Sequence, residues 1–199
     1  CPGGFIVPAA TSSGEVVVNG MSPSRRNNKF ANSGIVVEIN VDKDIPKYDQ
    51  FGPLKGLEYQ KNLERLAFTS GGRTQSAPAQ RLVDFVDGKL SSSLNETSYQ
   101  PGLNSSPMHS LLPKIIGSRL RKGFDAFGKK MHGYYTNEAN IVGVESRTSS
   151  PVNIPRKENL EHPEIKGLFP CGEGGGYAGG IVSAAMDGER CAEAAIELL

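Results

Sequence analysis

Residues 167–195 read GLFPCGEGGGYAGGIVSAAMDGERCAEAA, in which a short apolar run and a cluster of glycines precede a helical pattern. The apolar run Leu168–Cys171 predicts a strand. After the glycines, apolar and small residues recur at helical spacing, at Ile181, Ala185, Gly188, Ala192, Ala195 and Leu199. We therefore expect a strand, a glycine loop and a helix, in that order.

The loop contains more glycines than a simple turn requires, namely Gly172, Gly174, Gly175, Gly176, Gly179 and Gly180. Glycine has no Cβ, so the backbone can approach a ligand closely. A helix N-terminus presents unpaired N–H groups and a partial positive charge, which favour phosphate or another electron-rich oxygen. The pattern therefore predicts a ligand at the start of the helix. Tight packing of the helix on a strand explains the same glycines equally well.

Composition limits the classes of function. The chain has 199 residues, 37% of them hydrophobic, and a formal net charge of +1, so its charge gives no general reason to expect nucleic acid or an anionic membrane as a partner. No apolar stretch approaches the roughly 20 residues that span a bilayer. The cysteines Cys1, Cys171 and Cys191 match no zinc spacing and indicate free thiols in a reducing, cytoplasmic compartment. No metal site is predicted, and we expect Cys171 to be a small buried side chain.

The remaining chain predicts an α+β fold. β-Branched residues separated by turn-formers predict an antiparallel unit of strands at Phe5–Ala9, Glu15–Asn19 and Ile35–Asn40. Amphipathic patterns predict helices at Leu57–Phe68, at Ala79–Val86 and over residues 112–131, with a long loop at Ser91–Pro107. A last strand is expected at Asn140–Ser146. The order describes a helical excursion from a small β unit.

Five segments together resemble a known family, the mostly uncharacterised bacterial FAD-dependent dehydrogenases, which are flavoproteins with a split FAD-binding domain. The segments are CPGGFIVPAA (1–10), VVVNGMSPSRRNNKFANSGIVV (16–37), APAQRLVDF (77–85), GVESRTSSPVNI (143–154) and GLFPCGEGGGYAGGIVSAAMDGERCAEA (167–194). They span the chain in matching order, and the last is the most specific. Members of the family carry a GxGxxG loop upstream that binds the ADP half of FAD, and this chain lacks one.

The resemblance implies that the chain is a C-terminal fragment of a larger flavoprotein. An opening of Cys-Pro-Gly-Gly in place of an initiator Met fits that expectation. Residues 1–160 would form the inserted substrate-side domain, with its helical excursion at about 53–135. Residues 161–199 would form the return segment of the FAD-binding domain.

The resemblance also implies which residues approach the cofactor. Gly172 and Glu173 would lie near the ribityl and pyrophosphate groups, and Tyr177 to Ile181 near the flavin ring. N–H groups of the helix start would stabilise the negative charge of reduced flavin. The full set of expected FAD contacts is Gly172, Glu173, Gly176, Tyr177, Ala178, Gly179, Gly180 and Ile181.

Arg147 and Thr148, in RTSSP, resemble a segment of the family that lies near the flavin or the substrate. An arginine there can bind an anionic group in forked geometry. A structural arginine paired with one of the acids of this chain is an equally good interpretation. The resemblance identifies no catalytic residue.

The leading hypothesis is an FAD-dependent oxidoreductase acting on an unidentified small-molecule substrate. The missing N-terminal FAD-binding region would complete the site, so the 199 residues alone would be inactive and bind FAD weakly or not at all. The alternative is a non-catalytic module that binds a phosphate-bearing ligand or a protein partner. Nucleic-acid binding comes third, because the charge is balanced.

Overall fold

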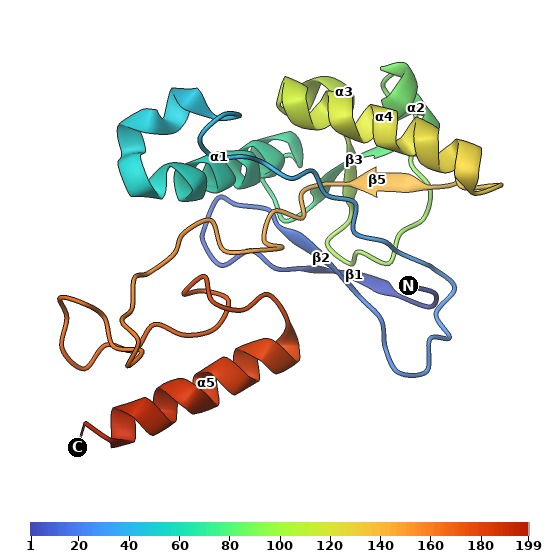
Figure 1. Ribbon diagram of the computed structural model, residues 1–199. Coiled ribbons are helices and arrows are strands. Elements are labelled where there is room, and N and C mark those ends of the chain that lie inside the picture. Colours follow the sequence, from blue (N-terminus) through green and yellow to red (C-terminus); the bar gives the residue numbers. More distant parts are fainter. Residues whose placement is uncertain (199) are drawn as a thin grey trace. The chain divides into compact units, whose positions relative to one another are not determined.

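The computed structural model describes residues 1–198 and divides the chain into two compact units. Unit 1 comprises Cys1–Pro46 and Lys61–Ser146, and unit 2 comprises Lys47–Gln60 and Arg147–Leu199. The division falls within the 3-10 helix η1 (Pro46–Leu54) and the helix α1 (Lys55–Ser70). Helices and small sheets occur together along the chain, which confirms the α+β class (Figure 1).

Unit 1 contains two small sheets. Strands β1 (Phe5–Pro8) and β2 (Val18–Met21) pair antiparallel, with Phe5 opposite Met21. In the second sheet, β3 (Ala77–Arg81) lies between β4 (Leu103–Ser105) and β5 (Asn140–Val142), parallel to the first and antiparallel to the second. The expected antiparallel pair at the N-terminus is therefore present, and the second sheet is mixed.

Two clusters of buried side chains form the core of unit 1. One joins β2 to the unit 1 part of α1, and the other joins α2 (Leu82–Asp87) to α3 (Met108–Leu111) and α4 (Lys114–Lys130). Figure 1 shows α2, α3 and α4 gathered beside β3 and β5. Val144 packs against both clusters and links them. The clusters consist of Val16, Val18, Ala67, Ala77 and Tyr99, and of Leu82, Phe85, Met108, Leu112 and Phe124.

The prediction of a helix over Ala79–Val86 is wrong in its first half. Residues 77–81 form the central strand β3, and the helix begins only at Leu82. Ala77 and Ala79 are fully buried, so tertiary packing overrides the helical preference of alanine. The Asn137 Oδ1 atom accepts hydrogen bonds from the Val83 and Asp84 N–H groups, at 2.9 and 3.2 Å, and caps the helix from a distant part of the chain.

The predicted strand Ile35–Asn40 is also wrong. The segment is extended, but within residues 1–198 it joins neither sheet. Ile35 packs on the cluster that contains Phe124, and the Arg119 Nη1 atom donates a hydrogen bond to the Glu38 carbonyl at 2.8 Å. The β-branched residues here pack against a helix, which gives the same alternating pattern as a strand in a sheet.

In unit 2, the helix α5 (Ile181–Ile196) follows a long irregular segment that begins at Arg147. The helix after the glycines is therefore confirmed, except that Leu199 lies outside the described residues. The expected strand Leu168–Cys171 is absent from the described part of unit 2. A strand requires a neighbour for its backbone hydrogen bonds, and residues 147–198 contain none.

Candidate functional site

A buried ion pair holds the glycine loop of unit 2 against α5. The Arg156 guanidinium donates to both carboxylate oxygens of Asp187, Nη1 to Oδ2 at 3.0 Å and Nη2 to Oδ1 at 2.8 Å. Arg156 Nη1 also donates to the Pro170 carbonyl at 2.9 Å, and the Gly172 N–H donates to Asp187 Oδ2 at 2.9 Å. The pair therefore fixes both ends of the tripeptide Pro170–Gly172.

The electrostatics of the pair match its geometry. Hydrogen bonds from Arg156 and from the Gly172 N–H lower the pKa of Asp187 to about 2. The hydrogen bond to Asp187 raises the pKa of Arg156. The guanidinium carbon also lies 3.6 Å from the centre of the Tyr177 ring, a cation–π contact. Arg156 therefore also holds the ring of Tyr177 in place.

A second set of hydrogen bonds ties the glycine loop to residues 150–154. The Ile154 N–H donates to the Gly175 carbonyl at 3.1 Å, and the Tyr177 hydroxyl donates to the Ile154 carbonyl at 2.8 Å. Gly176 has φ +85°, and a Cβ there would lie 2.8 Å from the Val152 carbonyl oxygen. Only glycine fits this position without strain. The conformation of the loop is therefore fixed by its neighbours before any ligand is considered.

The start of α5 presents free backbone donors. The Ile181 and Val182 N–H groups have no hydrogen-bond partner among residues 1–198, and neither has the N–H of Gly179. The Gly180 N–H, by contrast, donates to Ser183 Oγ at 3.1 Å. A Cβ at Gly179 would meet no atom within 4 Å. These N–H groups and the open space beside them suit an electron-rich oxygen, as expected for a carbonyl or phosphate group.

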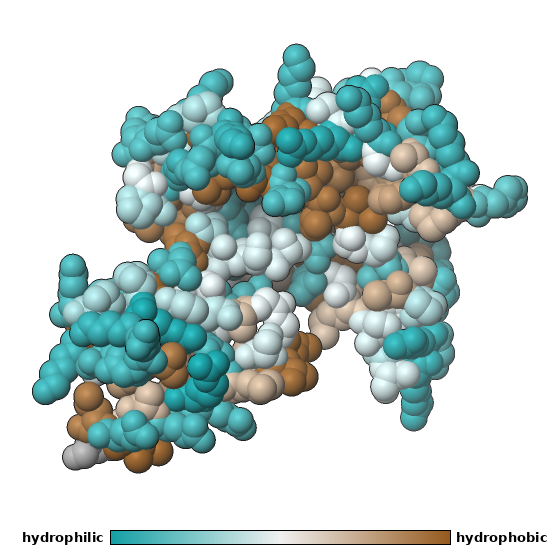
Figure 2. Space-filling model, in the orientation of Figure 1, coloured by the Kyte–Doolittle hydropathy of each residue, from teal (hydrophilic) through white to brown (hydrophobic). Residues whose placement is uncertain are grey.

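The apolar stripe of α5 is exposed. Ile181 is 93% exposed, Val182 72%, Met186 57% and Ile196 69%. Figure 2 shows hydrophobic surface at both ends of this helix. The opposite face of α5 carries Asp187 and Cys191, both buried. These apolar side chains of α5 are therefore uncovered within residues 1–198.

The predicted site residues lie within a single unit. All eight expected FAD contacts, together with Arg147 and Thr148, belong to unit 2. Ser150 links the segment that contains Arg147 and Thr148 to the glycine loop, since its hydroxyl oxygen lies 3.3 Å from the Gly174 carbonyl oxygen. Glu173 and Thr148 are exposed, and Arg147 is half-buried. The structure describes their positions, and their roles toward a cofactor stay predictions.

Two outcomes differ from the sequence expectations. Cys171 is exposed, not buried, whereas Cys191 on α5 is 4% exposed. Sequence reasoning also missed the roles of Arg156 and Asp187. The available signal for Asp187 was its position one helical turn before Cys191, a residue type that is usually buried.

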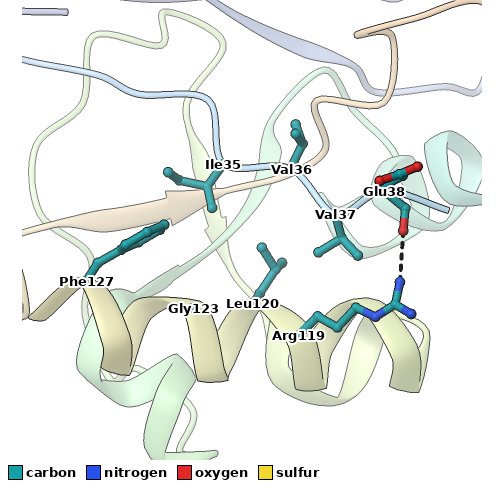
Figure 3. Close-up of a pocket in the computed structure, with 8 residues that line it drawn as sticks. All are labelled: Ile35, Val36, Val37, Glu38, Arg119, Leu120, Gly123 and Phe127. Carbon is teal, nitrogen blue, oxygen red and sulfur yellow. Dashed lines mark hydrogen bonds between the residues drawn. The ribbon is translucent and has the colours of Figure 1, made fainter.

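Unit 1 contains a shallow apolar groove of about 270 Å³ between α4 and the extended segment Ile35–Glu38. Figure 3 shows Ile35, Leu120 and Phe127 lining it, with Arg119 bonded to the Glu38 carbonyl at one end. Hydrophobic surface beside α4 is also visible in Figure 2. The groove contains none of the predicted site residues.

Two further features are absent from residues 1–198. No group of three or more His, Cys, Asp or Glu side chains in that range could hold a metal ion. In the same range, no helix is long and apolar enough to cross a membrane.

Comparisons with known proteins identify the family. The family described as "FAD-dependent protein, C-terminal domain-like" matches residues 1–148, and the chain belongs to it. An uncharacterised protein of Clostridium beijerinckii is 41% identical over 199 residues, which is 99% of this chain and 37% of that protein. The chain therefore spans little more than a third of the length of this relative. The family match ends at residue 148, so it does not include the glycine loop that begins at Gly172, whereas the match to the relative does.

The residues of the loop fit the cofactor that the family name implies. Free N–H groups at the start of α5 can donate to a flavin carbonyl, and the bare backbone at Gly179 allows close approach. No carboxylate other than that of Glu173 lies within residues 171–181, so little negative charge opposes an anion there.

Proposed function

We propose that this chain supplies the flavin-ring side of an FAD site in a larger FAD-dependent oxidoreductase. The observation that carries the proposal is the pre-formed glycine loop, which leads into the free N–H groups of α5. Membership of an FAD-dependent family supports it. FAD, when bound, supplies hydride or single-electron transfer.

Each part of the loop would then have its own task. Gly172 and Gly176 would carry the backbone along the ribityl chain, and Glu173 would accept a hydrogen bond from a ribityl hydroxyl. The Gly179 and Ile181 N–H groups, with the positive end of the α5 dipole, would donate to the electron-rich edge of the ring. The Gly180 N–H already donates to Ser183, so it contributes only if the Ser183 hydroxyl rotates away.

The Arg156–Asp187 pair would act indirectly, by holding the loop in place before the cofactor binds. Its atoms are buried, and they bond to the Pro170 carbonyl and the Gly172 N–H. Preorganisation of this kind reduces the conformational entropy that binding must overcome. Tyr177, stacked on Arg156, would form one wall beside the ring.

Two further features fit a site completed by another region. The apolar stripe of α5 is more exposed than is usual in a folded protein, where large apolar patches are generally covered by another region or a partner. The relative is almost three times as long as the region that matches this chain, so its remaining part is available to cover the stripe. We propose that this part binds the ADP half of FAD. We also propose a small molecule as the substrate.

Substitution of a single glycine tests the proposed FAD site. The chain is placed in the Clostridium beijerinckii relative, in exchange for the region that it matches, and FAD affinity is measured by titration. Gly179→Val fills space that is open in the structure, so we expect an unchanged melting temperature and FAD binding weaker by more than about tenfold. Gly174→Val, also in open space but outside the predicted contacts, is the matched control and should bind FAD normally.

Equal FAD affinity of the Gly179 and Gly174 variants would contradict the placement of the flavin. If the unsubstituted hybrid folds but binds no FAD, the chain would instead be a non-catalytic module for a phosphate-bearing ligand or a protein partner.

A further inference from the structure

Two thiols lie together beside the glycine loop, and the proposed flavin site does not use them. Cys171 is exposed in the loop, and Cys191 is buried on α5. The Cys191 Sγ atom is 3.8 Å from the carbonyl oxygen of Pro170, the residue directly before Cys171. The side chain of Cys191 therefore contacts the backbone immediately beside Cys171.

The surrounding ion pair holds the two cysteines in place. Arg156 Nη1 donates to Cys191 Sγ at 3.4 Å and to the Pro170 carbonyl at 2.9 Å. On the other side of Cys171, the Gly172 N–H donates to Asp187, which lies one helical turn before Cys191. Both neighbours of Cys171 are therefore attached to the turn of α5 that carries Cys191.

The two thiols have different environments. Cys171 is open to solvent and can meet an oxidant. Burial raises the pKa of Cys191, an effect that the positive charge of Arg156 opposes. An exposed thiol that reacts first and a buried neighbour that resolves the product form the usual arrangement of a redox-sensitive pair.

We propose that Cys171 and Cys191 form a redox-active pair that a hydroperoxide oxidises to an intramolecular disulfide. The Cys171 thiolate attacks the peroxide, so an S–O bond forms, the O–O bond breaks and an alcohol, or water from hydrogen peroxide, leaves. The Cys191 thiolate then attacks the Cys171 sulfur, so the S–S bond forms, the S–O bond breaks and water leaves. Two thiols lose two electrons and two protons, and the peroxide gains both.

The disulfide would join the glycine loop covalently to α5, at the point where the ion pair already holds it. Oxidation would therefore fix the loop covalently to the helix. The proposal depends only on the local geometry of unit 2, and it stands or falls independently of flavin binding.

The test uses the 199-residue protein with Cys1→Ser, so that only the two cysteines of interest remain. The protein is treated with a small excess of hydrogen peroxide, quenched with an alkylating reagent and analysed by intact mass and peptide mapping. We expect the loss of two hydrogen atoms, no alkylation and a cross-linked peptide pair that contains Cys171 and Cys191. Dithiothreitol should restore both alkylation sites.

Single variants separate the two roles. With Cys191→Ser, Cys171 should stop at the sulfenic acid, which a dimedone probe detects, or at higher oxides. With Cys171→Ser, the buried Cys191 should react at least about tenfold more slowly. The proposal is overturned if Cys171 in the Cys1→Ser protein is oxidised to the sulfinic acid while Cys191 stays alkylatable, or if the only cross-links join two molecules.

Discussion

Arg156 and Asp187 show how much the position of the loop depends on one pair of side chains. Both side chains are buried, with 10% and 7% exposure, and Arg156 donates to both oxygens of the carboxylate. Removing the guanidinium leaves this carboxylate buried and unpaired. Such losses typically cost about 3–5 kcal/mol.

We therefore expect Arg156→Met to lower the free energy of unfolding by about 3 kcal/mol or more in urea denaturation of the 199-residue protein. Lys157→Met removes an exposed positive charge from the next residue and should change stability by less than about 0.5 kcal/mol. Similar curves for the two variants would show that the ion pair does not hold the loop.

The pH dependence of stability follows from the pKa of Asp187. Folding lowers this pKa from 3.8 to about 2, so the folded state favours the ionised carboxylate. The contribution is fully present above pH 3.8 and is lost as the pH falls toward 2. Urea midpoints measured from pH 5 to pH 2 should therefore decline less steeply for Asp187→Asn than for the unsubstituted protein. Parallel declines would indicate that Asp187 is not paired in solution.

At the residue scale, the glycine loop could be predicted from the sequence and the ion pair could not. The conformational freedom of glycine follows from the residue type itself, so the loop could be predicted from residues 172–180 alone. The partners Arg156 and Asp187 are 31 residues apart, and only the folded chain brings them together. Cys171 was expected to be buried because a typical cysteine is, yet its side chain faces solvent here.

At the scale of elements, the glycine loop differs from an ordinary flexible turn. Gly176 combines a positive φ with a close approach to the Val152 carbonyl, whereas Gly174 has open space around it. We expect Gly176→Ala to reduce stability by at least about 1–2 kcal/mol, and Gly174→Ala to leave it nearly unchanged. Thermal unfolding of the two variants checks this difference. Equal melting temperatures would mean that the loop is not fixed in the described conformation.

The errors at this scale share one cause. Ile35–Asn40 and Leu168–Cys171 both have the residues of a strand, but a strand also requires a partner. The first packs its β-branched side chains against α4. The second has no strand beside it within the described part of unit 2. In contrast, α1, α4 and α5 were predictable, because a helix makes its own backbone hydrogen bonds.

At the scale of the whole molecule, the two sides of α5 differ in their contacts. One side is satisfied inside unit 2 by Arg156, Pro170 and Gly172, and the other is an exposed apolar stripe. The α+β class could be read from the sequence, because it follows from local patterns. The proposed covering of the stripe could not be read in this way, since 63% of the length of the relative lies outside the matched region.

A shared FAD site, as proposed, makes FAD binding depend on a region beyond these 199 residues. The most direct test is an FAD titration, followed by flavin fluorescence and visible absorbance, of the 199-residue protein and of the full-length Clostridium beijerinckii relative. We predict stoichiometric binding by the relative and weak or no binding by the 199-residue protein. Tight binding by the 199-residue protein would contradict a site shared with another region, and no binding by the relative would contradict the flavin site itself.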